Sequence, residues 1–209
     1  QFMIGTTEVQ AANAVYLGGL KSEVAVGQKL EVEGSISNNV ITATKVKFQD
    51  SVRLEGIVSS FTGSTMTLVG MPTITITLNS ATEVKGTTPV NTGDRVKVRG
   101  REGATVAGIV NVIATEVDGN GVDGCATCDV DLQGAVQTFA NPFLTILGVP
   151  INTSTSGSDF SDPADFQGLN DQVIGRAAFF GSVQVGTVVK VKGRLTTGVI
   201  TWREVELED

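Results

Sequence analysis

The sequence of 209 residues contains no histidine, and this absence excludes several kinds of catalytic and metal site. Ser-His-Asp and Cys-His triads need an imidazole, and histidine is also the commonest general base in enzymes. Imidazole-bound zinc, copper and haem iron are excluded for the same reason. A hydrolase could work with acids alone, but no carboxylate pair stands out among the many acids on alternating strand positions. We therefore expect the chain not to be an enzyme.

Cysteine is also scarce, with only Cys125 and Cys128, two residues apart. A covalent c-type haem site would need histidine where Asp129 stands. Thioredoxin-like redox chemistry needs a neighbouring βαβ unit, and zinc would need two further good ligands. The spacing favours a disulfide over free thiols and over a metal or redox site. Closing so short a loop would stabilise the fold by about 2 kcal/mol, and it would indicate an oxidising compartment.

Basic residues, aromatic residues and long apolar runs are few. The chain has 15 Lys and Arg against 22 Asp and Glu, and its net charge of −7 disfavours binding to nucleic-acid phosphates. No apolar stretch approaches the roughly 18 residues of a membrane-spanning helix. We expect neither a nucleic-acid partner nor a membrane span. The sequence shows no signal peptide, which is compatible with removal of a leader before Gln1.

What the sequence does contain is a motif present three times, in which two glycines bound a strand of alternating apolar and charged residues. The copies lie at 27–34, 93–100 and 186–193. Repeats of this kind decide the architecture of a chain. We predict an all-β fold of three tandem small OB-like β-barrel repeats, at 1–50, 51–121 and 122–209.

The middle repeat is the template for this prediction. Its alternating segments predict five strands, at 54–61, 65–70, 73–78, 93–100 and 112–117. The longest connection separates the third strand from the fourth, which matches the strand order of an OB-type barrel. The alternation predicts which side chains point inward (Val96, Val98, Val189 and Val191) and which point outward (Lys97 and Lys192).

The third repeat carries an insertion near 154–182. Residues 161–166, with Pro163, indicate a helix start and a helix of two or three turns. The insertion holds four phenylalanines: Phe160, Phe166, Phe179 and Phe180. They belong either to a helix that plugs the end of the barrel or to an exposed patch for a partner.

The first repeat is incomplete, because no segment corresponds to its first strand. The neighbouring strands would leave open edges, which are templates for pairing with another chain. We expect a strand from a neighbouring molecule to fill this position and to join subunits into a filament. The alternatives are that the chain is a fragment, or that the tail after Trp202 or the linker near Val122 fills the position. The expected assembly edge consists of Phe2, Met3, Ile4, Leu30 and Val32.

The strand and turn pattern also resembles that of a known protein family, over nearly the whole chain. Its residues are Glu55-Gly56-x-Val58, Thr67-Leu68-x-Gly70, the motif at 93–100 and Ile113-Ala114-Thr115-Glu116-Val117. This set resembles a bacterial domain family of unknown function, whose members are exported proteins with tandem OB-like β-barrel repeats. The resemblance implies a bacterial source and a place outside the cell or at its surface, and it implies no catalytic residue.

Two local features have competing interpretations. Arg95, Lys97, Arg99 and Arg101 alternate, so they are expected on one face. Nucleic-acid binding by an OB fold normally adds stacking aromatics, and Phe61 alone is near, so a solvated face is favoured.

The acidic stretch Asp118, Asn120 and Asp123 resembles a calcium loop, but Val122 stands where an EF-hand needs Asp or Asn. A Gly-rich linker is therefore favoured over a calcium site. Asp159, Asp162 and Asp165 form a second weak calcium candidate, and we expect no other cofactor.

We expect a non-catalytic extracellular structural or assembly protein, with copies of itself as the partner. The alternative is an extracellular module that binds glycan or protein partners, with the insertion around Phe166 as the expected site.

Overall fold

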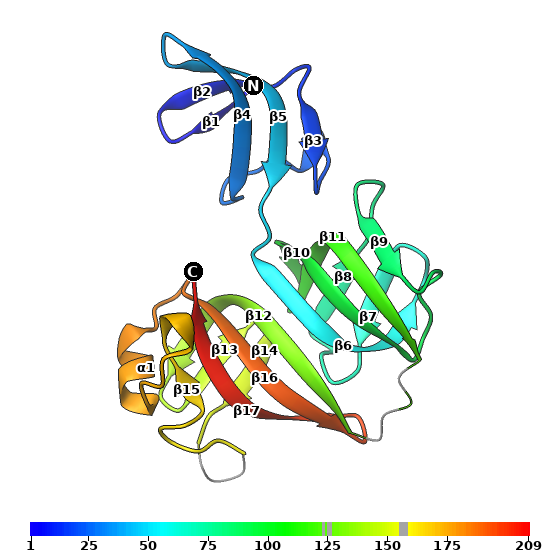
Figure 1. Ribbon diagram of the computed structural model, residues 1–209, viewed down its shortest axis with the longest axis vertical. Helices are drawn as coiled ribbons and strands as arrows, with labels where there is room; N and C mark the ends of the chain where they lie inside the picture. The colour runs from blue at the N-terminus through cyan, green and yellow to red at the C-terminus, as the bar shows by residue number, and fades with distance from the viewer. Residues whose placement is uncertain (123, 125–126, 155–158) are drawn as a thin grey trace.

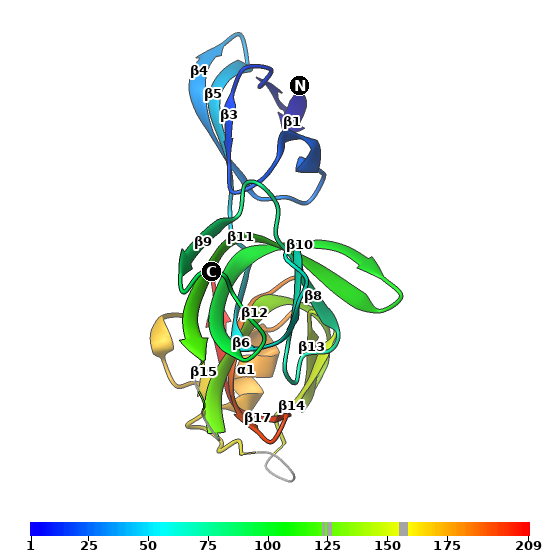
Figure 2. The same cartoon turned by 90° about the vertical axis from the view of Figure 1, so that its right-hand side faces the viewer.

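The structure is a computed structural model that describes residues 1–122, 124, 127–154 and 159–209. This part of the chain is predominantly β and has a single α-helix (Figure 1). The strands form three consecutive units, which we number in chain order: unit 1 (2–48), unit 2 (52–122) and unit 3 (127–208). Unit 1 lies at one end of the long axis in both ribbon views (Figures 1 and 2). The predicted all-β class is confirmed, and the described helix is too short to cross a membrane.

Unit 2 is a closed ring of strands. Its elements are β6 (Val52–Phe61), β7 (Thr65–Leu68), β8 (Ile74–Thr77), β9 (Glu83–Gly86), β10 (Asp94–Val106) and β11 (Ile109–Val122). Neighbours pair in the order β6, β7, β8, β11, β10 and back to β6, and all pairs are antiparallel except β8 with β11. The five ring strands agree with the five predicted ones. The sequence does not predict β9, which lies parallel to β11.

The repeated motif folds as its alternation predicts. In a strand, successive side chains point to opposite faces. The valines are buried and the lysines are not: Val96, Val98, Val189 and Val191 are at most 1% exposed, Lys97 is exposed and Lys192 is half-buried.

The two glycines of the motif are needed for different structural reasons. The opening one (Gly27, Gly93 or Gly186) has a φ of 91° or 92°, in the left-handed region that favours glycine. The closing one (Gly34, Gly100 or Gly193) lies at a β-bulge, where the register between two strands shifts. A Cβ on Gly100 would lie 2.4 Å from the carbonyl oxygen of Ile113. Glycine therefore allows the adjacent strand to approach at the bulge.

Unit 1 has the same pairing pattern with one strand fewer. Its elements are β1 (Phe2–Ile4), β2 (Thr7–Gln10), β3 (Val15–Leu17), a 3₁₀ turn η1 (Lys21–Glu23), β4 (Leu30–Ser37) and β5 (Val40–Phe48). β1 pairs with β2, β2 runs parallel to β5, and β5 pairs with β4. These strands correspond to β7, β8, β11 and β10 of unit 2. Among the described residues, no strand takes the place that β6 has in unit 2.

Unit 3 repeats the pattern and adds the insertion. Its elements are β12 (Thr127–Ala140), β13 (Phe143–Ile146), β14 (Val149–Asn152), β15 (Phe166–Gln167), a 3₁₀ turn η2 (Leu169–Asp171), α1 (Arg176–Ser182), β16 (Val188–Thr196) and β17 (Val199–Glu208). No pairing between described residues joins β14 to β17, so the ring does not close. The prediction of three OB-like barrels is therefore not supported, because two of the three units are open rings.

The helix of the insertion begins later than predicted. Phe166 is fully buried and pairs with Val205 as part of β15, so the chain near Pro163 makes a turn rather than a helix. The helix is α1, which begins at Arg176. The Asp162 carboxylate accepts a hydrogen bond of 2.9 Å from the backbone N–H of Arg176. Asp162 therefore binds the first backbone N–H of α1 from a distant turn, while the residue at the N-cap position of α1 is Gly175.

Units 2 and 3 share one hydrophobic core, and unit 1 has its own. The shared core extends from Val52 to Val205, and β6 pairs with β12 across the boundary, with Leu54 opposite Leu132. The buried part of the unit 1 core is four small side chains: Val9, Ala11, Ala43 and Val46. Unit 1 therefore has a much smaller hydrophobic core than units 2 and 3.

Candidate functional site

The first candidate site is the strand slot, the space between β1 and β4 in unit 1. It is a cavity of about 570 Å³ lined by Phe2–Gly5, Val24–Gln28 and Leu30. In unit 2, β6 fills the corresponding space and pairs with β7 on one side and β10 on the other. β1 and β4 each have one described strand partner, so each leaves a row of backbone donors and acceptors facing the slot.

Side-chain exposure confirms that the slot leaves apolar surface open. Ile4 is 39% exposed, whereas Leu68 at the corresponding position of β7 is 2% exposed. Met3 lines the same cavity and is 58% exposed. Val26 at the rim is fully exposed. Phe2 and Leu30, which also line the slot, are half-buried, as is Val32 on β4. Four of the five residues of the expected assembly edge line the slot, and the fifth, Val32, lies further along β4.

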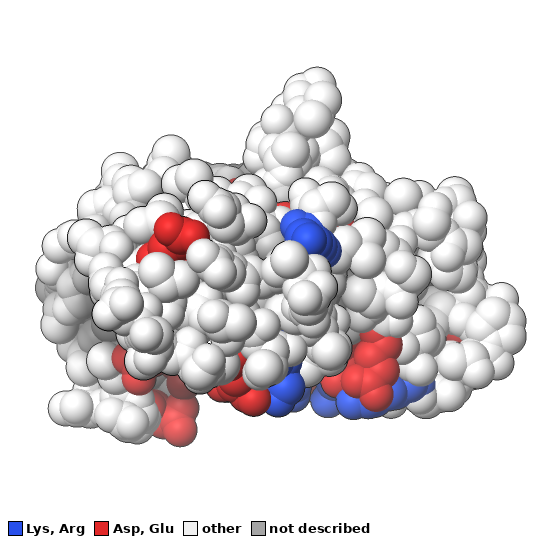
Figure 3. Space-filling view, turned by 90° about the horizontal axis from the view of Figure 1, so that it is seen from above, with Lys and Arg blue, Asp and Glu red and all other residues white. Residues whose placement is uncertain are grey.

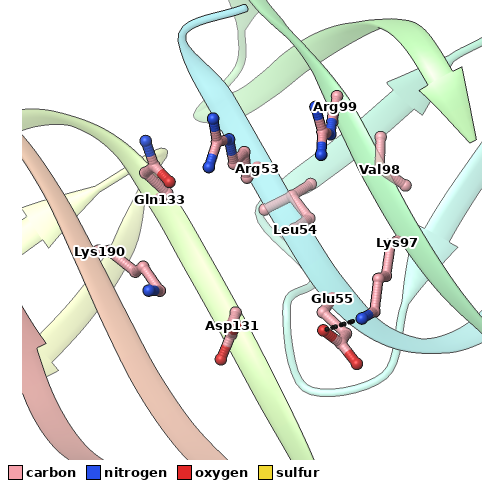
Figure 4. Close-up of a pocket in the computed structure, with 9 residues that line it drawn as sticks. All are labelled: Arg53, Leu54, Glu55, Lys97, Val98, Arg99, Asp131, Gln133 and Lys190. Carbon is pink, nitrogen blue, oxygen red and sulfur yellow. Dashed lines mark ion pairs between the residues drawn. The ribbon is translucent and has the colours of Figure 1, made fainter. Parts of the chain in front are cut away.

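The second candidate site is the charged pocket, a cavity of about 220 Å³ on the outer face of the sheet where β6 lies between β10 and β12 (Figure 4). Its side chains lie in two rows across the strands. The first row contains Arg99, Arg53, Gln133 and Lys190, and the second contains Lys97, Glu55 and Asp131. Leu54 and Val98 complete the lining. Four basic and two acidic side chains therefore face one small space.

Several of these charges already have protein partners. Glu55 accepts from Arg95 at 2.6 Å and lies 3.6 Å from Lys97. Lys190 lies 3.2 Å from Glu206, and Arg99 lies 3.9 Å from Glu116. Such partly exposed pairs contribute little to stability, about 0–1 kcal/mol each.

Three polar groups of the pocket have no hydrogen bond or ion pair with any described residue. They are the Arg53 guanidinium, the Asp131 carboxylate and Gln133 Oε1, which is buried. Burial raises the pKa of Asp131, the negative charge of Glu55 raises it further, and Lys190, Lys192 and Lys97 oppose the shift. A buried acceptor without a donor is unusual in proteins, and sequence patterns do not reveal one. The pocket is therefore a site that sequence reasoning missed.

Arg101 does not share a face with the other basic residues of β10, contrary to the prediction. The bulge between Arg99 and Gly100 reverses the alternation, so Arg101 points the other way and is 2% exposed. Its guanidinium donates to the Gly18 carbonyl at 2.6 Å and to Glu23 at 2.5 Å, and it lies 4.1 Å from the centre of the Phe48 ring. Arg101 thus connects unit 2 to unit 1.

The comparison with protein families gives one match for each of the three units. A family model described as "Domain of unknown function (DUF5666)" matches residues 1–47, 55–118 and 133–206. The chain belongs to this family. Neither the curated proteins nor the solved structures give a match. Each DUF5666 match covers most of one unit, and the description assigns no activity to the family.

The third DUF5666 match contains the four phenylalanines of the insertion, and the structure places all of them in the core. Phe160, Phe166, Phe179 and Phe180 are at most 9% exposed. Their rings form a chain of contacts with centroids 5.5–5.9 Å apart. The four rings therefore pack inside unit 3 and do not form a surface patch.

The remaining predicted residues are the calcium candidates and the two cysteines. Asp118 and Asn120 lie on β11, and Cys128 is buried on β12. Asp123 and Cys125 lie outside the described residues, so the calcium site and the disulfide stay predictions. No cluster of three metal-ligating side chains occurs among the residues that the structure describes. The weak candidates Asp159, Asp162 and Asp165 include two that bond to backbone N–H groups, of Arg176 and Ser161.

The face seen from above, over unit 1, carries few charges. Most of it is neither basic nor acidic, and most of the visible basic and acidic side chains lie along one edge, with one acidic and one basic group further in (Figure 3). This face therefore offers no continuous basic surface.

Proposed function

We propose that this chain is a non-catalytic structural subunit that assembles with copies of itself by strand complementation, outside a bacterial cell. The observation that carries the proposal is the strand slot, which has two free strand edges and exposed apolar side chains where unit 2 has β6. An extended segment in the slot would gain main-chain hydrogen bonds on both sides and would cover Ile4 and Met3. The extracellular location rests on the family resemblance and on the predicted disulfide.

The occupant that we propose is a strand from a second copy of the chain. A precedent lies within the molecule, because the first strands of units 2 and 3, β6 and β12, pair edge to edge across the unit boundary. The donor segment and the slot would be different surfaces of the same subunit. Such a contact is heterologous, and repeating it leads to a filament rather than a closed dimer.

A finer architectural proposal accompanies this function. We propose that unit 2 is an OB-like barrel, and its support is the closed ring with β8 parallel to β11. A strand in the slot would give unit 1 the same ring.

The test places a photocrosslinking amino acid at Met3, which is 58% exposed at the slot. The purified native assembly is irradiated and the crosslinked peptides are identified by mass spectrometry. Isotope-labelled and unlabelled subunits are mixed before assembly, so that links between copies carry both labels. We expect one extended peptide of a neighbouring copy at Met3. The matched control is the same amino acid at Val106, which is 69% exposed at the tip of the β10–β11 hairpin and far from the slot in sequence.

A substitution gives a second, independent measurement. Ile4→Lys places a charge in the slot and is expected to abolish filaments in electron micrographs while circular dichroism stays unchanged. Val106→Lys should leave filaments intact. A crosslink from Met3 to residues of the same chain, together with monomeric sedimentation of the native protein, would show that the proposal is wrong.

A further inference from the structure

The charged pocket has the properties of a ligand site, independently of the strand slot. Gln133 is 8% exposed, and its Oε1 accepts no hydrogen bond from any described residue. Leaving a buried acceptor unpaired costs about 1–3 kcal/mol. The amide points into the space between β12 and β6, towards the side chain of Arg53 (Figure 4). Its terminal torsion is broad, so the amide can turn either its oxygen or its nitrogen to a ligand.

The basic row of the pocket favours an anion. Arg53 lies directly opposite Arg99 across the β6–β10 pair, and like charges in this arrangement repel. Arg53 has no acidic partner among the described residues, and the nearest acid of Arg99 is 3.9 Å away. Two guanidinium groups side by side match a carboxylate, which can accept two parallel hydrogen bonds.

The other side of the pocket favours hydroxyl groups. Asp131 is half-buried and, like Gln133 Oε1, has no donor among the described residues. A ligand that satisfies the pocket must therefore present one carboxylate and, a short distance away, several O–H donors. The cavity of about 220 Å³ is below the 300–1,000 Å³ typical of sites for drug-sized ligands. One sugar ring is an appropriate size.

We propose that the charged pocket binds a carboxylate-bearing sugar unit of an acidic polysaccharide. Arg53 and Arg99 bind the carboxylate, and Gln133 and Asp131 accept hydrogen bonds from the hydroxyl groups. A neutral sugar would leave the arginines without an anion, and a glutamate side chain of a peptide would leave Gln133 and Asp131 without donors.

The test is titration calorimetry of the intact protein with trigalacturonate, a neutral trisaccharide of glucose, and a blocked triglutamate peptide. We expect heat from trigalacturonate alone. Arg53→Gln should weaken this binding about tenfold, since it removes a charge-assisted hydrogen bond. The matched control is Arg194→Gln, which makes the same charge change at an exposed residue of β16 outside the pocket. It should leave the affinity within about twofold, because rim charges away from the contact contribute little.

Gln133→Met tests the buried oxygen. Methionine keeps the shape of the side chain and removes the unpaired acceptor, so folding should be retained, and the thermal midpoint is measured alongside. We expect weaker trigalacturonate binding with an equal or higher midpoint. The proposal is overturned if trigalacturonate does not bind, if the neutral sugar or the peptide binds equally well, or if Arg53→Gln and Arg194→Gln have equal effects.

Discussion

At the scale of single residues, Arg101 connects units 1 and 2 through a buried ion pair with Glu23. Its guanidinium is almost fully buried, and burial lowers its pKa. Glu23 and the Gly18 carbonyl accept its hydrogen bonds and so compensate the buried positive charge. Glu23 in turn accepts hydrogen bonds from the backbone N–H of Leu20 and from Asn79. The contact thus belongs to a network that joins η1 to unit 2.

Replacing Arg101 should therefore weaken the contact between unit 1 and unit 2 and lower the stability of the protein. Arg101→Met is expected to lower the free energy of unfolding by about 3 kcal/mol, because it leaves Glu23 without its cation at the interface. Arg99→Met is the matched control on the same strand, and because Arg99 is exposed it should cost no more than about 0.5 kcal/mol. Denaturant titration measures both variants, and equal losses would contradict the proposed role of Arg101.

Asp131 is expected to make stability depend on pH. Its pKa is raised in the folded protein, mainly by burial and then by Glu55, so the folded state binds this proton more tightly than the unfolded state. The free energy of unfolding should therefore fall as pH rises from about 4, the unfolded value, through the raised folded pKa. Asp131→Asn removes this cost, so the variant should be more stable than the wild type at pH 7.

The measurement compares both proteins by denaturant titration at pH 3 and pH 7. The gain from Asp131→Asn should be present at pH 7 and absent at pH 3. Glu102 and Glu206 also have pKa values raised by burial, but they occur in both proteins and cancel in the difference. Asp159→Asn, at an exposed position, is the control. A gain of the same size at both pH values would contradict the assignment.

At the scale of secondary structure, the sequence predicts the long strands because each buries one face. Alternation and bounding glycines are local signals, so β6, β8 and β10 follow from them directly. The short parallel strands β3, β9 and β15 carry no such signal, because their pairing partner is distant in the chain. The predicted helix start at Pro163 is wrong for the same reason, since Phe166 pairs with Val205 of β17, which is distant in the chain. The slot could be predicted from a missing repeat element, whereas the charged pocket depends on register between units.

The closing glycine of the motif should be the least replaceable residue of its strand. In Gly100→Ala the new methyl group would lie 2.4 Å from the Ile113 carbonyl oxygen, so the bulge must distort. We expect a loss of about 3 kcal/mol, as for other overpacked interior positions. Gly181→Ala, in α1 with no atom near its Cβ, should be neutral or slightly stabilising. Thermal unfolding of both variants measures the difference, and a mild effect at Gly100 would contradict the bulge argument.

At the scale of the whole molecule, the separation of the two cores predicts how the chain unfolds. Units 2 and 3 share a continuous core and an edge-to-edge strand pair, so they should unfold together. The core cluster of unit 1 has four small buried apolar residues and the unit has an open slot, so its local stability should be low. Trp202 is the single tryptophan and lies buried in unit 3, so its fluorescence reports on units 2 and 3 alone.

We therefore predict two transitions for the dissociated subunit in increasing denaturant. Hydrogen exchange of unit 1 peptides should rise first, and the Trp202 fluorescence change should follow at higher denaturant. In assembled protein a donor strand would complete the ring of unit 1, and because binding to the folded state stabilises it, the first transition should move up towards the second. Ile4→Lys should keep the early transition under both conditions. If both probes change together in the dissociated wild-type subunit, unit 1 is stable without a donor strand, and the physical reason for strand complementation is lost.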